Sequence, residues 1–267
     1  MSDLARLAAH LDGLGRVLLG YSGGVDSALL AVVATRALGV DRFLAVLGLS
    51  PSLAASQCSS AIELAAQFSI PLLRLDTREL EDPRYVANPT DRCYFCKSEL
   101  WQRLSVEAAA RGHPSVIDGT NADDLMEHRP GLRAAAEFGI RSPLAELGWT
   151  KADVRVSARG LGIPNWDAPA SPCLSSRIRY GLEVTPDRLH QVDQAEAFIR
   201  SLGVSGDLRV RHQGNLARIE VDPTQFDLVS RHWAEIERLF HTIGFARVER
   251  DPRGYRRGGL LSLAGRI

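Results

Sequence analysis

The sequence predicts an α/β protein: a parallel sheet with helices on both faces, followed by a small C-terminal α+β domain. Two observations support this. Through about residue 165, apolar runs of strand length alternate with segments of helical periodicity, which is typical of a parallel sheet covered by helices. Beyond that point, a helical pattern precedes two segments of alternating polarity separated by Gln213-Gly214-Asn215, which indicates a β-hairpin. We therefore expect domains at residues 1–170 and 171–267.

Four strands and three helices are expected in the first domain. The apolar runs predict strands at residues 17–21, 43–49, 71–75 and 115–118. The helical patterns cover approximately residues 26–38, 54–68 and 96–111. Ligands of such sheets bind at the carboxyl ends of the strands, so the segments after the first and fourth strands are the candidate binding loops.

The second domain is expected to begin with the segment around residues 172–181. Pro186 fits the start of a helix whose apolar face repeats at helical spacing. The hairpin strands are expected at residues 208–211 and 217–221, followed by a helix over about 224–241 and a strand at 246–249.

The composition is that of a globular protein. Of 267 residues, 45% are hydrophobic and 24% are charged, and no apolar run is long enough to cross a membrane. The N-terminus lacks the layout of a signal peptide, so we expect a cytoplasmic protein without a membrane partner. Lys plus Arg equals Asp plus Glu at 32 each, which argues against an extended nucleic-acid surface.

The segment at residues 20–27, Gly-Tyr-Ser-Gly-Gly-Val-Asp-Ser, is the most informative one. It lies between a strand pattern and a helix pattern, where backbone N–H groups of a turn form an anion site. Gly23 and Gly24 allow close approach of a ligand, and Ser22 and Ser27 add hydroxyl donors. No Walker Gly-Lys-Ser/Thr follows. The segment resembles the pyrophosphate loop of the ATP pyrophosphatases and predicts ATP binding; the resemblance implies that Asp26 would help to place Mg²⁺. The alternative is an ordinary strand–helix turn.

A second candidate nucleotide segment is Asp118-Gly119-Thr120-Asn121, followed by Ala122, Asp123 and Asp124. Backbone and amide groups at the end of a strand can contact a nucleotide, and nearby carboxylates can hold Mg²⁺ through water. The alternative is a solvated turn that closes the strand.

Four cysteines are present, and in a cytosolic protein they indicate metal, cluster or redox chemistry rather than a disulfide framework. Cys93 and Cys96 form a Cys-x-x-Cys pair, whose thiolates can share a metal or an iron–sulfur cluster or cycle as a redox pair. Cys58 lies in a helical pattern and is expected to be a buried, small apolar residue.

Cys173 lies in the segment Ser171-Pro172-Cys173-Leu174-Ser175-Ser176-Arg177. Hydroxyl groups flank the thiol, Ser176 among them, and a nearby arginine such as Arg177 favours the reactive thiolate. We therefore treat Cys173, Ser176 and Arg177 as candidate catalytic residues.

Two arginine pairs are candidate anion ligands. Arg209 and Arg211 are spaced to project from one face of a strand, and Arg256 and Arg257 are adjacent. Arginine suits bidentate capture of phosphate or carboxylate. The alternative is an exposed strand face whose arginines pair with Glu220 and Glu249.

Taken together, these segments resemble the ATP-dependent sacrificial sulfur transferases (the LarE family) of nickel-pincer nucleotide cofactor biosynthesis, over almost the whole chain. The resemblance rests on residues 21–27, 92–97, 118–124, 128–132, 141–144, 172–177, 209–211 and 217–221. It implies an adenine nucleotide α-hydrolase-like fold and a pyridinium-dicarboxylate mononucleotide substrate, whose phosphate Arg209, Arg211 and Arg256 would receive. A homo-oligomer is also implied.

The resemblance implies the following reaction. ATP adenylates a substrate carboxylate, releasing pyrophosphate; a cysteine sulfur then attacks the acyl-adenylate, and AMP leaves. Cleavage of the carbon–sulfur bond gives a thiocarboxylate and leaves dehydroalanine, and the matching cysteine is Cys173. The resemblance also implies a second version, in which three cysteines hold a [4Fe–4S] cluster and leave one iron free to carry an extra sulfide. Here these cysteines would be Cys93, Cys96 and Cys173, and the sulfur would come from the cluster. The three thiols favour the cluster route.

Two other functions stay open from the sequence. A tRNA thiolase of the ATP pyrophosphatase type combines the same loop with three cysteines, but its RNA partner calls for a basic surface that the balanced charge does not indicate. A non-catalytic nucleotide-binding module is opposed by the intact residues of the 22–27 loop.

Overall fold

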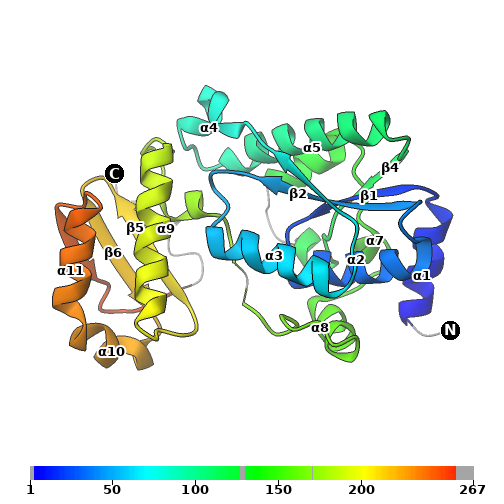
Figure 1. Cartoon of the computed structure of the whole chain (residues 1–267). Helices are drawn as coiled ribbons and strands as arrows, with labels where there is room; N and C mark the ends of the chain where they lie inside the picture. The colour runs from blue at the N-terminus through cyan, green and yellow to red at the C-terminus, as the bar shows by residue number, and fades with distance from the viewer. Residues whose placement is uncertain (1–2, 127–129, 170, 257–267) are drawn as a thin grey trace. The chain divides into compact units, whose positions relative to one another are not determined.

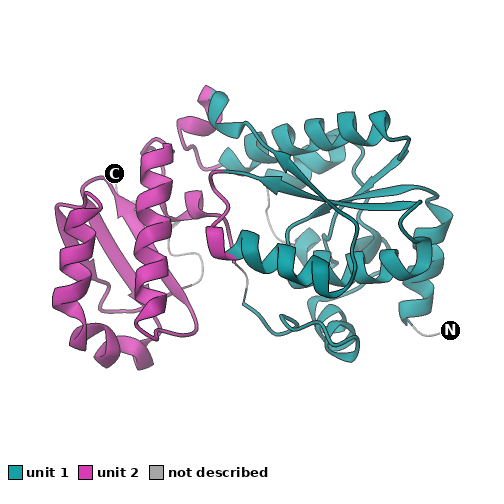
Figure 2. Ribbon diagram, viewed as in Figure 1, with its two compact units in different colours: residues 1–50, 57–82, 91–170 teal, residues 51–56, 83–90, 171–267 magenta. Residues whose placement is uncertain are grey.

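The computed structural model describes residues 3–126, 130–169 and 171–256, which form two compact units (Figure 2). The first comprises residues 1–50, 57–82 and 91–170, and the second comprises 51–56, 83–90 and 171–267. His128, Arg129 and Arg257, which the sequence singled out, lie outside the described residues, as does residue 170 at the expected domain boundary.

The first unit is built on a four-stranded parallel sheet in the order β3-β2-β1-β4 (Figure 1). Its strands are β1 (Val17–Tyr21), β2 (Phe43–Leu49), β3 (Leu72–Asp76) and β4 (Ser115–Ile117). Val17 pairs with both Phe43 and Ser115, so β1 lies in the middle of the sheet. The predicted parallel α/β architecture is confirmed, and the strand bounds differ from prediction only by single residues in β3 and β4.

Helices cover both faces of this sheet (Figure 1). The unit contains α1 (Asp3–Gly13), α2 (Val25–Leu38), α3 (Ala55–Gln67, whose first two residues fall in the second unit), α5 (Arg92–Ala110), α6 (Pro130–Glu137), α7 (Pro143–Glu146) and α8 (Lys151–Gly160). On one face, Trp101 and Leu104 of α5 pack with Leu18 and Val46 of the sheet. Gly20 allows this contact, because a Cβ there would lie 2.7 Å from the Trp101 ring.

Helix α2 lies against the other face of the sheet, and α1 and α8 pack against α2. Its side chains are buried almost all round, from Val25 to Leu38. A helix surrounded in this way is apolar on every side and shows no polar stripe. This explains why the sequence there is a continuous apolar run.

The second unit contains a three-stranded sheet in the order β5-β6-β7. β5 (Leu208–Gln213) and β6 (Leu216–Val221) form the predicted antiparallel hairpin, and β7 (Arg247–Arg250) pairs parallel to β6. Helix α9 (Pro186–Ser201) packs on β5, with Ala195 and Ile199 in a core shared with Val210 and Phe240. Buried aliphatic and aromatic side chains thus give this unit a core of its own.

The single helix predicted over about residues 224–241 is wrong. The chain forms a 3-10 turn (Pro223–Gln225), then α10 (Phe226–Arg231) and α11 (Trp233–Thr242), which meet at His232. The backbone of His232 leaves the helical region at φ −100° and ψ 13°. Val229 and Ile236, on either side of the break, both lie in the core, and no glycine or proline marks the break in the sequence.

Two segments from the N-terminal half belong to the second unit, whereas the sequence placed them in the first domain. Residues 83–90 include α4 (Pro83–Val86), and Asn88 donates through Nδ2 to the carbonyls of Arg179 (2.9 Å) and Leu182 (2.8 Å). In residues 51–56, the carbonyl of Ser52 accepts from the N–H of Leu174 at 2.8 Å. A single cut of the chain does not describe these units.

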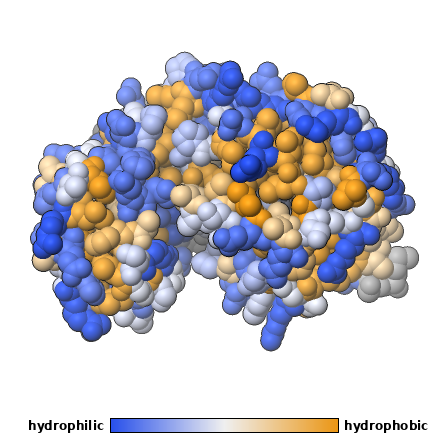
Figure 3. Space-filling model, viewed as in Figure 1, coloured by the Kyte–Doolittle hydropathy of each residue, from blue (hydrophilic) through white to orange (hydrophobic). Residues whose placement is uncertain are grey.

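The surface carries both hydrophilic and hydrophobic residues. On the face in Figure 3, hydrophilic residues surround and separate hydrophobic ones. Val40, Met126 and Val156 are among the large apolar side chains exposed in the described residues. Across those same residues, none of the helices has the length and apolar character needed to span a bilayer.

Candidate functional site

The predicted nucleotide turn connects the carboxyl end of β1 to the start of α2. Gly23 has φ +74°, and a Cβ there would lie 2.5 Å from Cβ of Ala61, so both conformation and packing require glycine. Gly24 is the N-cap of α2 and has an extended conformation, and no side chain caps the N-terminus of this helix. The first N–H groups of α2 therefore meet at the turn, which is the arrangement that binds phosphate.

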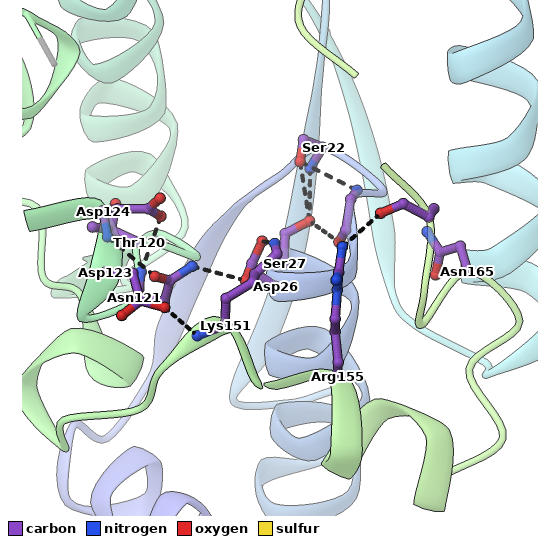
Figure 4. Close-up of polar contacts among 12 residues, drawn as sticks. Ser22, Asp26, Ser27, Thr120, Asn121, Asp123, Asp124, Lys151, Arg155 and Asn165 are labelled. Carbon is purple, nitrogen blue, oxygen red and sulfur yellow. Dashed lines mark hydrogen bonds and ion pairs between the residues drawn. The ribbon is translucent and has the colours of Figure 1, made fainter. Parts of the chain in front are cut away.

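The two serines hold the turn in this shape (Figure 4). Ser27 is buried, its Oγ donates to the carbonyl of Gly24 at 3.0 Å, and it accepts from the N–H of Ser22 at 3.3 Å. The two hydroxyl oxygens are 3.1 Å apart. Ser22, Gly23, Gly24 and Ser27 thus form one hydrogen-bonded unit.

The loop after β4 meets this turn, as the sequence predicts. A Cβ on Gly119 would lie 2.9 Å from the N of Ser27, so only glycine permits the approach. Asn121 is buried and donates through Nδ2 to Asp26 at 3.1 Å. Thr120 instead bonds Asp118 through its N–H (3.0 Å) and Oγ1 (2.8 Å), which is the turn-closing role offered as the alternative. The structure therefore brings Gly119 and Asn121 to the turn and leaves Thr120 with Asp118.

The carboxylates beside the turn are suited by type to Mg²⁺, which is commonly held by one or two carboxylates together with substrate phosphates. Asp26 is partly exposed, while Asp123 accepts from the N–H of Lys151 at 2.8 Å. Within the described residues, no cluster of three or more His, Cys, Asp or Glu side chains has the arrangement of a metal site. Among these carboxylates, Asp26 belongs to the turn segment itself, where it contacts Asn121 and Lys151.

Three side chains at the turn were missed by the sequence analysis: Lys151, Arg155 and Asn165. Lys151 Nζ forms an ion pair with Asp26, and Asn165 donates through Nδ2 to the carbonyl of Gly23 at 2.7 Å. Arg155 points from α8 toward the turn in Figure 4. The available signal is weak: Thr150 and Asp153 form a capping box, and Lys151 follows the cap directly.

Cys93 and Cys96 lie in the first turn of α5, Cys93 exposed and Cys96 partly buried. The turn is packed against α6: the Arg133 guanidinium lies 3.8 Å from the centre of the Tyr94 ring, and the Tyr94 hydroxyl donates to Glu137 at 2.6 Å. Cys58 in α3 is partly buried rather than buried as expected. Cys93 and Cys96 belong to the first unit and Cys173 to the second.

The Cys173 loop is held by its arginine. Cys173 precedes a 3-10 turn (Leu174–Arg177), and its Sγ lies 3.0 Å from Oγ of Ser175. Arg177 is buried and donates to the carbonyls of Pro172 and Cys173 and, at 3.0 Å, to Oγ of Ser176. The sequence suggested that this guanidinium would act on the thiol; these bonds instead fix the main chain around it.

Glu196 of α9 neutralises that arginine, and the sequence analysis did not identify it. Its two carboxylate oxygens accept from Arg177 at 2.9 and 3.0 Å, and one also accepts from the N–H of Val210 at 2.9 Å. Because Glu196 lies 19 residues beyond Arg177 on another element, no local pattern announces the pair.

Arg209 and Arg211 of β5 are buried, so the exposure expected in the alternative is wrong, whereas the pairing with Glu220 that it expected is confirmed for Arg211. Arg211 pairs with Glu220 at 2.8 Å and donates to the carbonyl of Ser176 at 3.0 Å. Burial, reinforced by the charge of Arg177, lowers the pKa of Arg209.

The remaining residues of that prediction, Arg256 and Glu249, do not pair with these buried arginines. Arg209 faces the ring of Tyr255 at 5.1 Å, and Arg256, which follows Tyr255, is exposed. Glu249 pairs with Arg218 and Arg247 rather than with Arg209 or Arg211.

Comparison with known proteins gives one family match and several full-length relatives. Residues 6–85 match the NAD synthase family. An uncharacterized protein of Synechocystis sp. is 45% identical over 261 residues, covering 97% of each chain. The pyridinium-3,5-bisthiocarboxylic acid mononucleotide synthase of Lactiplantibacillus plantarum is 35% identical over 254 residues, 95% of this chain and 92% of that protein.

An uncharacterized protein of Methanocaldococcus jannaschii is 31% identical over 233 residues, 87% of this chain and 88% of that protein. Because the match to the synthase covers 95% of this chain, it includes residues of both units rather than the first unit alone. The chain therefore belongs to the LarE family and is an ATP-dependent enzyme that transfers sulfur.

Proposed function

We propose that this enzyme transfers sulfur to a carboxylate of a pyridinium mononucleotide in the biosynthesis of the nickel-pincer nucleotide cofactor. The observation that carries the proposal is the 35% identity, over 95% of the chain, to a protein named as a pyridinium-3,5-bisthiocarboxylic acid mononucleotide synthase. The glycine turn and the cysteine loop supply the two chemical parts that such a reaction needs.

The first part is activation of the carboxylate. A carboxylate oxygen attacks the α-phosphorus of ATP, the bond to the bridging oxygen breaks, and pyrophosphate leaves with the electron pair. The turn formed by Ser22, Gly23, Gly24 and Ser27 would bind the phosphates, and Asp26 would place Mg²⁺, which neutralises their charge when bound. Gly119 and Asn121 would adjoin the nucleotide from the loop after β4. Activation is needed because a free carboxylate is a poor electrophile, whereas AMP is a competent leaving group.

The second part is the sulfur step at Cys173. The thiolate attacks the acyl carbon and AMP leaves, forming a thioester. Loss of the Cα proton and cleavage of the Cβ–Sγ bond then release the thiocarboxylate and leave dehydroalanine. Arg177 and Ser176 would keep the thiol in place through the loop contacts described above, and Arg209, Arg211 and Arg256 would receive the substrate phosphate.

Two sources of sulfur fit this assignment. Cys173 gives up its own Sγ, or it joins Cys93 and Cys96 as ligands of a [4Fe–4S] cluster that supplies sulfide when bound. Cysteine thiolates are the ordinary ligands of such clusters. The presence of Cys93 and Cys96 favours the cluster as the source. We further propose a cytoplasmic homo-oligomer.

The test is anaerobic purification with measurement of iron, acid-labile sulfide and the visible spectrum, together with ATP binding and sulfur transfer. Cys173→Ala should abolish sulfur transfer and leave ATP binding unchanged, because the thiol reacts only after activation. Cys58→Ala is the matched control and should behave as the wild type. Sulfur transfer by Cys173→Ala would contradict the role given to this residue.

The same preparation separates the two sources. Iron that is lost from Cys93→Ala, Cys96→Ala and Cys173→Ala, and kept by Cys58→Ala, would identify the cluster as the source. An iron-free wild type that loses H₂S from residue 173 in one turnover, as followed by mass spectrometry, would identify Cys173 as the sacrificed donor.

A further inference from the structure

We propose that helix α8 is a cationic wall of the nucleotide site, in which Lys151 and Arg155 bind the pyrophosphate portion of ATP. The proposal deepens the function proposed above and rests on its use of ATP at the glycine turn. It assigns the departing pyrophosphate to two residues that come about 125 positions after the turn in the sequence.

The position of Lys151 is unfavourable for its own helix. It is the first residue of α8, where the helix dipole disfavours a positive charge. The helix start is already stabilised by the reciprocal hydrogen bonds of Thr150 and Asp153. Lys151 instead directs its ammonium group to Asp26 of the glycine turn, and both side chains retain solvent access at 36% and 20%. Its location is therefore explained by the site rather than by helix formation.

Asp26 is occupied from two sides in this arrangement. One carboxylate oxygen accepts from Asn121 at 3.1 Å, and the other contacts Lys151. A metal ion that arrives with the nucleotide would compete for the oxygen held by Lys151. The lysine ammonium is a compact charge on a flexible stem with three donors, so it can move from the carboxylate to a phosphate oxygen.

Arg155 is four residues further along α8 and therefore on the same side of the helix. Its Nη2 donates to the carbonyl of Ala168 at 3.4 Å, whereas its Nε is buried and has no hydrogen-bond partner among the described residues. The Oδ1 of Asn165 is likewise buried and has no hydrogen-bond partner among the described residues, although Nδ2 of Asn165 donates to the carbonyl of Gly23. A buried polar atom without a partner is unusual, and here two of them accompany the turn that binds phosphate.

The charge of these residues matches the chemistry of the leaving group. When the bond between the α-phosphorus and the bridging oxygen breaks, the electron pair stays on the oxygen of pyrophosphate. The added negative charge is stabilised by cations fixed beside it. AMP lacks the two outer phosphates and therefore gains no binding energy from Lys151 and Arg155. These two residues thus also distinguish ATP from AMP.

The test is calorimetric binding of Mg²⁺-pyrophosphate and of AMP to the whole protein, with pyrophosphate release measured in parallel. Lys151→Gln and Arg155→Gln should each weaken pyrophosphate binding about tenfold, the loss of one charge-assisted contact, while AMP binding is unchanged. Lys151→Arg keeps the charge and should recover part of the binding. Arg159→Gln is the matched control, since Arg159 belongs to the same helix but stacks on Trp166 at 5.0 Å.

Each outcome is decisive. Pyrophosphate affinity that stays at the wild-type value in Lys151→Gln and Arg155→Gln would overturn this inference and leave the proposed function intact. A wild type that binds neither pyrophosphate nor ATP would overturn both. Loss of AMP binding in step with pyrophosphate binding, or an equal loss in Arg159→Gln, would show general damage to the unit and would also overturn the inference.

Discussion

The two candidate sites are held together by different interactions. In the first unit, the turn at residues 22–27 keeps its shape through hydroxyl and main-chain hydrogen bonds and a glycine at φ +74°. In the second unit, the loop at 173–177 is held by buried guanidinium groups, with Arg177 on Glu196 and Arg211 on Glu220. The ion pair at the turn, Lys151 with Asp26, is by contrast partly exposed.

This difference teaches where each unit is sensitive. A turn built from glycine and serine depends on fit, because a Cβ added at Gly23 would lie 2.5 Å from Cβ and 2.9 Å from Cα of Ala61. A loop built from buried charges depends on balance, because removing one partner leaves the other charge without compensation in a low-dielectric interior. The predictions below test this contrast through stability.

The largest effect is expected from breaking the Arg177–Glu196 pair. Glu196→Gln leaves a buried guanidinium without its counter-charge and should lower the free energy of unfolding by about 3–5 kcal/mol. Asp12→Asn removes the partner of Arg42 in a pair that is 42% and 61% exposed, and should cost less than about 1 kcal/mol. Urea unfolding of both variants measures the difference, and equal losses would contradict the contrast drawn above.

A smaller effect is expected from His212, which is buried in the second unit beside Phe245 at 5.0 Å between ring centres. Burial lowers its pKa to about 4 from the ordinary 6.5, so the folded protein holds it neutral. Gln191 donates through Nε2 to the carbonyl of Ile243. Its Oε1 is therefore the atom that accepts from Nε2 of His212. The ring is thus fixed in its Nε2–H form.

The sign of the pH dependence follows from this lowered pKa. Between pH 6.5 and about 4 the unfolded chain binds a proton that the folded chain does not, so stability is complete above pH 6.5 and falls as pH is lowered through this window. The loss attributable to His212 is about 3 kcal/mol. Unfolding of His212→Gln should show a shallower decline between pH 7 and pH 4.5 than the wild type, whereas exposed His190→Gln should keep the wild-type slope. Parallel curves for all three proteins would exclude this role.

The smallest effect is expected from an added methyl group at the turn. Gly119→Ala places a Cβ 2.9 Å from the N of Ser27 and should destabilise the protein by about 1–3 kcal/mol, with weaker ATP binding because the turn must shift. Gly160→Ala, in α8 with open space around it, should instead raise stability slightly. Thermal unfolding and ATP titration report both effects. Wild-type behaviour of Gly119→Ala would show that the loop after β4 does not constrain the turn.

Local pattern was sufficient for the sheet and for the turn. The strands around residues 17–21 and 43–49 and the hairpin were predictable because side-chain periodicity and turn residues are read over a few neighbours. The turn was predictable for the same reason, since Gly23, Gly24 and the two serines lie within six consecutive residues. The split at His232 was not predictable, because no glycine or proline between Phe226 and Thr242 marks it.

Contacts between distant segments account for what was missed. Lys151 reaches Asp26 across about 125 residues, Glu196 reaches Arg177 from another helix, and Asn88 holds the carbonyls at 179 and 182 from the N-terminal half of the chain. Each of these residues is, by local criteria, an ordinary polar residue on a helix or in a loop. Their roles arise only when folding buries them or brings them to a partner.

The sequence by itself determined the α/β class, the glycine turn at the end of β1 and the residue types that carry the chemistry, since these depend on short-range periodicity and on adjacent residues. The tertiary structure alone decided that segments 51–56 and 83–90 join the second unit, that Arg177 and Arg211 are neutralised by Glu196 and Glu220, and that α8 presents Lys151 to Asp26. The physical reason is that burial and charge pairing depend on which distant segments meet, and local pattern does not encode that meeting.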